Sequence, residues 1–128
     1  MKLSKEEIER YLEDVKNAVR NKKYRLDRNI NRSDNNDLFY DYVIDSEMAE
    51  KIILNLTAMD FSERLNNEHK GYEHELLYVF GKEVELLERF GSKKETVSLY
   101  IKFNKLTNNF VIVISFHKQK YPIKYYFK

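Results

Sequence analysis

The chain is organised around the stretch TVSLYIKFN (Thr96–Asn104), KLTNN (Lys105–Asn109) and FVIVISFH (Phe110–His117). Both outer runs are rich in β-branched and aromatic residues, and an Asn-rich segment between two such runs is typical of a tight turn. The sequence therefore predicts a β-hairpin here. The second run is apolar until Ser115 and ends on His117, which places an imidazole at the end of a buried strand.

Two helices are predicted before this hairpin. Ser4 and Glu7 have the spacing of a capping box, and apolar residues then recur at helical spacing, so a helix is expected over residues 5–21. A second helix is expected to begin at Ser46 and to end near Ala58, because apolar residues again recur along one helical face.

Shorter elements are expected between and after these helices. They are an extended segment or strand over Lys22–Asp27, one or two helical turns over Leu38–Tyr42, and strands over Asp60–Leu65 and Glu75–Phe80. Gly81-Lys82 is expected to be a turn. The segment Glu83–Phe90 fits a strand by its Val and Phe, or a short helix by its Glu and Leu content.

Helices followed by an antiparallel meander predict an α+β fold, in which N-terminal helices pack on one face of a mostly antiparallel β-sheet. The length of 128 residues suits a single domain over residues 1–128. The opposite face of the sheet is then expected to be open and to carry the functional surface.

The composition excludes several classes of protein. The chain has no Cys, no run of 18 apolar residues and no visible secretory signal, so we expect a cytoplasmic protein without a membrane partner. Three separate glycines and the absence of a GxSxG motif argue against nucleotide-binding loops and serine nucleophiles. His69 and His74 lie in an acidic loop without HExxH spacing, so no metal and no cofactor are expected.

Positive charge is concentrated in two blocks. Residues 92–128 contain eight Lys and one acidic residue, Glu95, whereas residues 1–91 carry 15 basic and 20 acidic side chains. A second basic block covers Lys16–Arg32. Two basic blocks in a chain with ten Tyr suit RNA or an acidic protein as partner, and solubility alone is the alternative explanation.

Four polar residues of the hairpin have the chemistry that metal-free RNA cleavage needs. His117 can act as acid or base near neutral pH, Lys102 can stabilise a charged phosphorane, and Tyr100 can donate a hydrogen bond or stack on a base. Tyr100 and Lys102 share one face of their strand, and Ser115 and His117 share one face of theirs. A structural, hydrogen-bonded histidine at a strand end remains the alternative.

The turn is expected to decide whether those faces coincide. A loop with an even number of residues, such as Asn108-Asn109 or Leu106–Asn109, pairs odd with even positions and gathers all four side chains on one face. A loop with an odd number of residues separates them.

The sequence also resembles the MqsR-type toxins of bacterial toxin–antitoxin systems, within the RelE-like superfamily. The matching short motifs are spread over most of the chain: Ile52–Thr57 followed by Asp60-Phe61, Tyr78–Lys82, Leu99–Lys102, Ile114–His117 and Tyr121–Lys124. The resemblance implies a RelE-like α+β fold, metal-independent mRNA cleavage that inhibits translation, and neutralisation by a cognate antitoxin protein.

Carried over residue by residue, the resemblance places Tyr100, Lys102 and His117 in the catalytic site, with Arg64 and Lys82 assisting. A further family lysine falls at Glu63, which would reverse its charge, or at Arg64, which would retain it. A family Gln has no counterpart, because Val79 or Phe80 stands there, and a common Trp is replaced by Tyr78. The residues expected to bind RNA are Tyr78, Lys118, Lys120, Tyr121 and Lys124.

The leading expectation is therefore an mRNA endoribonuclease toxin of a type II toxin–antitoxin system. The alternative is a catalytically silent RelE-like binding module from a mobile element, which regulates or blocks a nucleic-acid machine. The missing Gln and the uncertain position of Glu63 motivate this alternative.

Overall fold

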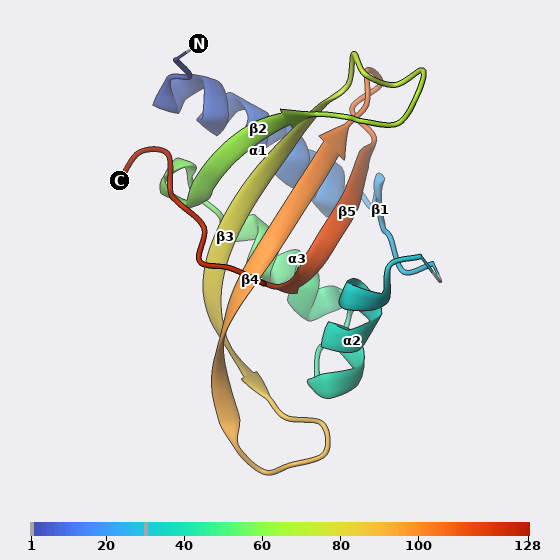
Figure 1. Cartoon of the computed structure of the whole chain (residues 1–128), viewed down its shortest axis with the longest axis vertical. Helices are drawn as coiled ribbons and strands as arrows, with labels where there is room; N and C mark the ends of the chain where they lie inside the picture. The colour runs from blue at the N-terminus through green and yellow to red at the C-terminus, as the bar shows by residue number, and fades with distance from the viewer. Residues whose placement is uncertain (1, 30) are drawn as a thin grey trace.

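The computed structural model describes residues 2–29 and 31–128, and this part of the chain forms an α+β fold (Figure 1). The helices are α1 (Lys5–Arg20), α2 (Ser33–Asp41), α3 (Ser46–Leu54) and the 3-10 helix η1 (Ala58–Asp60). The strands are β1 (Tyr24–Leu26), β2 (Phe61–Asn66), β3 (Leu76–Leu87), β4 (Lys94–Lys105) and β5 (Val111–Lys118). Within the described ranges, no helix is long and apolar enough to cross a membrane.

The strands form one open, mixed sheet with the order β1-β5-β4-β3-β2. The neighbours from β2 to β5 are antiparallel, as expected, whereas the short β1 adds to β5 in parallel. Helices α1 and α3 lie on one face of this sheet, and α2 lies beside the end of β5 (Figure 1). We call the face covered by α1 and α3 the helix face and the opposite one the open face.

The first helix follows directly from its sequence. Ser4 accepts the backbone N–H of Glu7, and the Glu7 carboxylate accepts the backbone N–H of Ser4, which confirms the capping box. The apolar stripe of the helix, which includes Ile8 and Val15, is fully buried against the sheet. This burial, rather than helix propensity, attaches α1 to the body of the protein.

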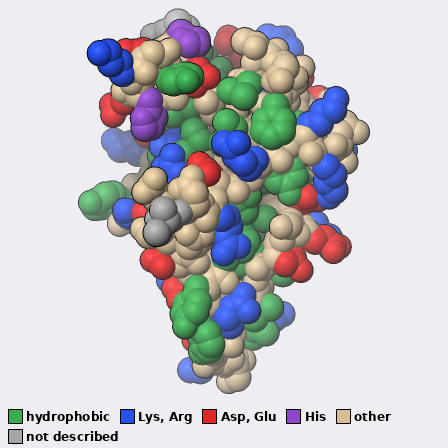
Figure 2. All heavy atoms as spheres, turned by 90° about the vertical axis from the view of Figure 1, so that its right-hand side faces the viewer, with side chains coloured by type: hydrophobic (Ala, Val, Ile, Leu, Met, Phe, Trp, Pro, Cys, Tyr) green, Lys and Arg blue, Asp and Glu red, His purple; other side chains and the backbone are tan. Residues whose placement is uncertain are grey.

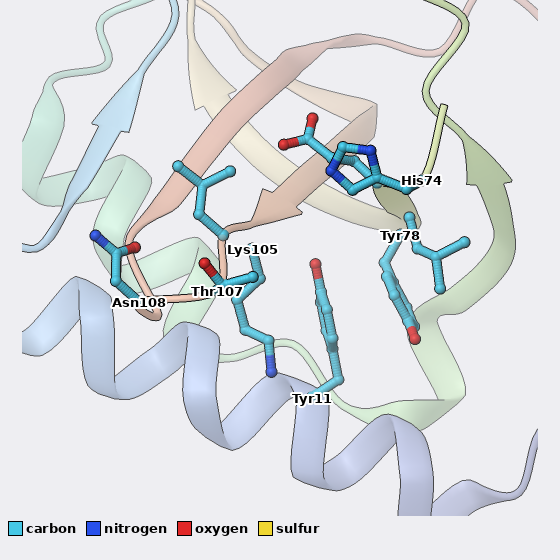
Figure 3. A pocket seen from close by; sticks show the side chains of 9 residues that line it. Tyr11, His74, Tyr78, Lys105, Thr107 and Asn108 are labelled. Carbon is cyan, nitrogen blue, oxygen red and sulfur yellow. The ribbon is translucent and has the colours of Figure 1, made fainter. Parts of the chain in front are cut away.

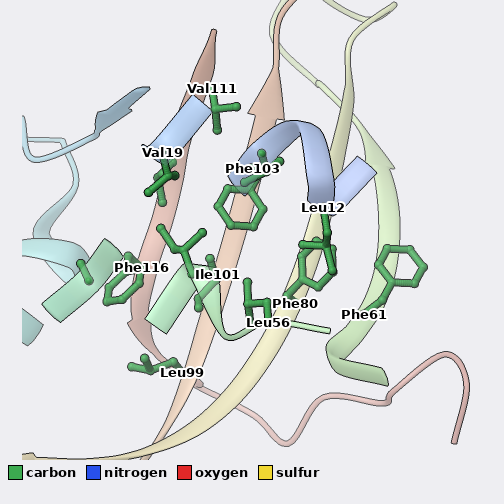
Figure 4. Packing of buried hydrophobic residues seen from close by; sticks show 14 of the residues in the cluster. Leu12, Val19, Leu56, Phe61, Phe80, Leu99, Ile101, Phe103, Val111 and Phe116 are labelled. Carbon is green, nitrogen blue, oxygen red and sulfur yellow. The ribbon is translucent and has the colours of Figure 1, made fainter. Parts of the chain in front are cut away.

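Four phenylalanines form the centre of the core on the helix face. Phe61, Phe80, Phe103 and Phe116 have no exposed surface, and they come from β2, β3, β4 and β5 respectively (Figure 4). Burying each such side chain contributes about 1.5–3 kcal/mol, so the four together fix which face of every strand points inward.

The prediction of a turn at Gly81-Lys82 is wrong, because β3 continues through both residues. Gly81 pairs with Tyr100 and Lys82 pairs with Leu99 in an unbroken antiparallel ladder. The ambiguous segment after Gly81 is accordingly a strand, and β3 and β4 extend beyond the body as a twisted hairpin (Figure 1).

The open face is only partly open, because the C-terminal tail (residues 119–128) crosses it. A Cβ atom at Gly81 would lie 2.5 Å from Ile123 and 2.6 Å from the Tyr125 hydroxyl, so the tail lies directly over this glycine. The backbone N–H of Tyr126 then donates to the Phe61 carbonyl oxygen at 2.8 Å. The expectation of a wholly free face therefore needs this correction.

Candidate functional site

The hairpin brings its four polar residues together on the open face. Tyr100 lies directly opposite His117, and Lys102 lies directly opposite Ser115. The rings of Tyr100 and His117 are stacked, with centroids 5.2 Å apart and an angle of 11° between the planes. Residues paired in this way share a face of the sheet, so the juxtaposition predicted from the sequence is present.

A β-bulge, and not the turn, produces this arrangement. The turn places Lys105 opposite Val111, an odd–odd pairing that would have separated the four side chains. The register shifts between Lys102 and Phe103, where Ile114 is the extra residue of β5. The turn-length criterion was therefore incomplete, because one inserted residue restores the odd–even pairing.

The bulge is held by a side chain from α2. Asn35, only 1% exposed, donates through Nδ2 to the Ile114 carbonyl oxygen at 2.9 Å. Its Oδ1 accepts the backbone N–H of Phe116 at 2.8 Å. The backbone groups on both sides of the bulge, which the ladder leaves without strand partners, are thus satisfied by one amide. No feature of the local sequence pointed to Asn35.

His117 is half-buried and held in one orientation. Its Nδ1 lies 2.7 Å from the carbonyl oxygen of Lys118. A carbonyl oxygen can only accept, so Nδ1 carries the proton in this contact and Nε2 is left as the basic nitrogen of the neutral ring. Asp34 and Lys120, which form an ion pair at 2.8 Å, line a cavity of about 220 Å³ together with His117.

Lys102 lines a second cavity of about 480 Å³ with Arg32 and His69. Burial lowers the pKa of Lys102, and the nearby Arg32 guanidinium lowers it further, against the opposing effects of Glu68 and Glu63. An ammonium group that is partly desolvated beside a second cation favours an anionic ligand. Sequence reasoning assigned Arg32 to the basic block but did not place it beside Lys102.

Tyr100 keeps its phenolic proton in this environment. Burial raises the pKa of Tyr100, and the Glu63 carboxylate raises it further. The hydroxyl is therefore a hydrogen-bond donor throughout the neutral pH range.

A second bulge places Glu63 and Arg64 on opposite faces of the sheet. The register of β2 shifts between Phe61 and Glu63, so Glu63 lies opposite Val79 on the open face and Arg64 lies opposite Tyr78 on the helix face. Glu63 is thus the residue near Lys102 and Tyr100, and the structure does not bring Arg64 into this group.

Two other predicted site residues also lie on the helix face. Lys82 forms an ion pair with Asp60 at 3.2 Å. Tyr78 stacks on Tyr11 of α1 with centroids 3.7 Å apart, so one face of its ring is covered. The structure therefore separates Lys82 and Tyr78 from His117, because strand alternation points them to the other side of the sheet.

Among the residues predicted to bind RNA, Lys118 ends β5, and Lys120, Tyr121 and Lys124 belong to the tail. Lys120 forms an ion pair with Asp34 and lines the cavity beside His117. Lys118 pairs with Leu99 on the helix face and lies 5.3 Å from the centre of the Tyr42 ring, so strand alternation separates it from His117. Tyr121 is 78% exposed, and Lys124 is also exposed. Figure 2 shows Lys and Arg side chains spread down the side of the molecule that carries β1 and α2.

In the part of the chain that the structure describes, no group of three or more His, Asp or Glu side chains is arranged to hold a metal ion. Comparisons of the chain with protein-family models, with curated proteins and with solved structures gave no significant match. The resemblance to MqsR-type toxins accordingly stays a prediction based on short sequence motifs.

Proposed function

We propose that the protein is a metal-independent endoribonuclease that cleaves single-stranded mRNA at the open face. The observation that supports this best is the stacked pair of His117 and Tyr100, with Lys102 two residues further along β4 on the same face. Together the three side chains supply a base, a hydrogen-bond donor and a cation within one patch.

His117 would begin the reaction. Its Nε2 takes the proton of a ribose 2′-hydroxyl while Nδ1 stays bonded to the Lys118 carbonyl oxygen. The 2′-oxygen then attacks the adjacent phosphorus, the bond to the 5′-oxygen of the next nucleotide breaks, and a 2′,3′-cyclic phosphate remains. The imidazolium returns its proton to the departing 5′-oxygen, directly or through the Tyr100 hydroxyl, so the proton balance closes.

Lys102 would stabilise the extra negative charge of the phosphorane. Diagonal neighbours on paired strands lie about 7–8 Å apart, which leaves room for one phosphate between the side chains of Lys102 and His117. Arg32 lines the same cavity as Lys102 and would support the second non-bridging oxygen. Lys120 and Tyr121 would bind the flanking nucleotides by charge and by stacking.

In this proposal the protein is a toxin of a type II system, as the resemblance to MqsR-type toxins implies. A cognate antitoxin would then cover the open face. A neighbouring gene that encodes a short DNA-binding protein would support this part of the proposal.

The test is purified protein incubated with a long mRNA in the presence of EDTA, with wild type beside His117→Ala. We expect cleavage by the wild type, products that end in a cyclic phosphate, and a loss of about 10²-fold or more in the variant. Equal cleavage by both proteins would remove His117 from the mechanism. An absence of cleavage by the wild type would contradict the proposal that the protein is an enzyme.

One observation favours the second candidate, a catalytically silent binding module. Glu63 stands on the open face, where its carboxylate affects both Lys102 and Tyr100 and would repel a phosphate. Expression in bacteria separates the candidates. Growth arrest that disappears in His117→Ala supports the nuclease, whereas arrest that persists in His117→Ala supports a binding module.

A further inference from the structure

A groove continues along the open face beyond Lys102. The cavity of about 480 Å³ that Lys102 lines adjoins a second cavity of about 530 Å³. The two cavities share four residues: Arg32, Asn67, His69 and Ile114. One wall is the loop between β2 and β3 (residues 67–75), which reaches across the ends of β4 and β5 (Figure 1). Asn104, two residues after Lys102 on the same face of β4, lines the second cavity, so this loop groove leads away from His117.

The loop is fixed in place by its own hydrogen bonds. Asn67 accepts the backbone N–H of His69 through Oδ1 and donates through Nδ2 to Glu75, both at 3.0 Å. Asn104 of β4 donates to the same Glu75 oxygen at 3.0 Å, which ties the loop to the sheet. The backbone N–H of Tyr72 donates to the His69 carbonyl oxygen at 2.9 Å. The loop groove is therefore formed before any ligand binds, which lowers the ordering cost of binding.

The surfaces of the loop groove suit flat, heteroaromatic rings. Tyr72 is 55% exposed and lines the groove, and the exposed His69 lines both of its cavities. The remaining apolar lining is mostly aliphatic: Leu65, Leu77, Leu106, Ile112 and Ile114. Unpaired nucleobases bind proteins by stacking on aromatic side chains, and every base has a face that can do so.

The charges of the loop groove are nearly balanced. Four cationic and three acidic side chains line it: Arg25, Arg32, Lys70 and Lys102, and Asp27, Glu68 and Glu75. Asp27 already accepts the Asn29 side chain at 2.9 Å and Arg32 Nε at 3.4 Å, which leaves the two terminal nitrogens of Arg32 for a phosphate. With a surplus of one positive charge, stacking of bases has to supply most of the affinity.

The direction of the strand follows from the proposed reaction. The ribose whose 2′-hydroxyl attacks lies at His117, and the phosphate lies between His117 and Lys102. A strand that continues past Lys102 into the loop groove therefore enters it with the nucleotide on the 3′ side of the cut bond.

We infer that the loop groove binds the two unpaired nucleotides that follow the cut bond, an assignment of position that rests on the proposed function. Each cavity is large enough for one nucleoside. The bases lie between the rings of the loop and the aliphatic floor, and the phosphates lie at Arg32 and Lys102. Stacking needs no 2′-hydroxyl, so the loop groove also binds single-stranded DNA.

DNA makes the binding test independent of cleavage, because it lacks the attacking 2′-oxygen. A four-nucleotide oligodeoxythymidylate is titrated into the full chain and followed by ¹H–¹⁵N NMR. We expect saturable shifts of the backbone amides of residues 67–72 and of Ile112, and no such shifts with a fully paired DNA hairpin. Shifts confined to residues 118–124, or no saturable shift, would overturn the inference. Loop shifts in a protein that leaves mRNA intact would support the loop groove and contradict only the nuclease.

Two pairs of variants test the stacking. Tyr72→Leu removes the ring, whereas Tyr72→Phe keeps it; we expect DNA binding to weaken about fivefold or more in the first and to be unchanged in the second. His69→Ala should weaken binding similarly. Its matched control is His74→Ala, because His74 belongs to the same loop but faces another cavity, beside Tyr11 of α1 (Figure 3). Unchanged affinity in both Tyr72→Leu and His69→Ala would contradict the inference.

Cleavage of short RNAs tests the direction. Extending a minimal substrate by two nucleotides on the 3′ side of the cut bond should raise kcat/KM by about tenfold in the wild type and by much less in Tyr72→Leu. A gain that comes only from extension on the 5′ side would overturn the assigned direction.

Discussion

Asn35 in α2 accepts the backbone N–H of Phe116 through its side-chain oxygen at 2.8 Å, although 81 positions separate the two residues in the chain. The same side chain donates to the carbonyl oxygens of Ile114 and Asp27. One buried amide therefore ties α2, the segment after β1 and the bulge of β5 together. Since that bulge brings His117 to the face of Lys102, Asn35 positions the candidate site without belonging to it.

Replacement of Asn35 by Ala should destabilise the protein and disturb the site at once. The variant leaves three backbone groups without partners, two of them buried, so we expect a loss of about 2–4 kcal/mol in the free energy of unfolding. Urea denaturation measures this loss. Asn36→Ala is the control, because Asn36 makes its bonds to Arg28 and Asn29 at the surface and should cost under about 1 kcal/mol.

A loss of that size should be accompanied by a change in the proposed activity. If the bulge relaxes, His117 turns to the other face, and cleavage at a temperature where the variant is still folded should fall together with the Tyr100–His117 contact seen by NMR. A variant that is as stable as the wild type would show that the ladder holds the bulge without Asn35.

The parts of the fold that depend on local periodicity could be predicted from the sequence. The capped first helix and the β4–β5 hairpin were expected within a few residues of their observed limits, because alternation and helical spacing are properties of contiguous residues. The parallel β1 strand is different, since its partner β5 lies at the other end of the chain.

The candidate site could be predicted only in part, because two bulges decide which residues share its face. Simple alternation from the buried Phe61 places Arg64 on the open face, but the bulge exchanges it for Glu63. This bulge is bonded by the tail: the Ser62 hydroxyl donates to the Lys124 carbonyl oxygen at 2.6 Å. Both bulges are thus bonded by segments distant in sequence, and no local pattern reports such contacts.

Lys102→Met should separate stability from function. Burial lowers the pKa of Lys102, which means that the folded state disfavours its charge. We therefore expect unfolding free energy at pH 7 to be unchanged or to rise by up to about 1 kcal/mol. RNA binding should weaken, and the slope of log affinity against log salt should fall by about 0.7, the value for one lost phosphate contact on a single strand.

The contribution of Lys102 to the pH dependence of stability has a definite sign. The folded protein releases the Lys102 proton more readily than the unfolded chain, so stability rises as pH increases from the lowered pKa toward the ordinary value of about 10.4. Lys102→Met should remove that rise. Lys51→Met, at an exposed position of α3, is the control. A variant with lower stability and unchanged RNA affinity would show that Lys102 is only structural.

Glu50→Gln should reduce stability at neutral pH but not in acid. The Glu50 carboxylate accepts hydrogen bonds from Lys22 and then from Tyr24, which lower its pKa. Its contribution is therefore fully present above the ordinary pKa of about 4.3 and is lost as pH falls through the lowered value. We expect a cost of about 0.5–1 kcal/mol at pH 7 that declines as pH falls below about 4.3, measured by chemical denaturation.

Glu47→Gln on the same helix is the matched control. Glu47 faces Lys51 at 3.7 Å, and both side chains are well exposed, so its loss should cost at most a few tenths of a kcal/mol, about 0.2–0.5. An equal effect of the two substitutions at pH 7 would mean that the contacts of Glu50 with Lys22 and Tyr24 do not stabilise the protein.

Gly81→Ala should release the C-terminal tail from the open face. The new methyl group would meet Ile123, the Tyr125 hydroxyl and the Gln119 amide, at 2.5, 2.6 and 3.0 Å. These are ends of side chains, so the tail can move away at a cost of about 1–3 kcal/mol. Trypsin should then cut after Lys120 and Lys124 faster than in the wild type, as followed by mass spectrometry.

Gly91→Ala is the control for that experiment, because the three atoms nearest to its methyl group all belong to the Glu88 side chain, with a carboxylate oxygen at 2.9 Å. The tail variant also tests which role the tail has at the site. If Lys120 and Lys124 bind RNA as proposed, releasing them weakens RNA binding; if the tail merely covers Tyr100, its release strengthens binding. We expect weaker binding, because Lys120 is held beside His117 by Asp34 and loses that position when the tail moves.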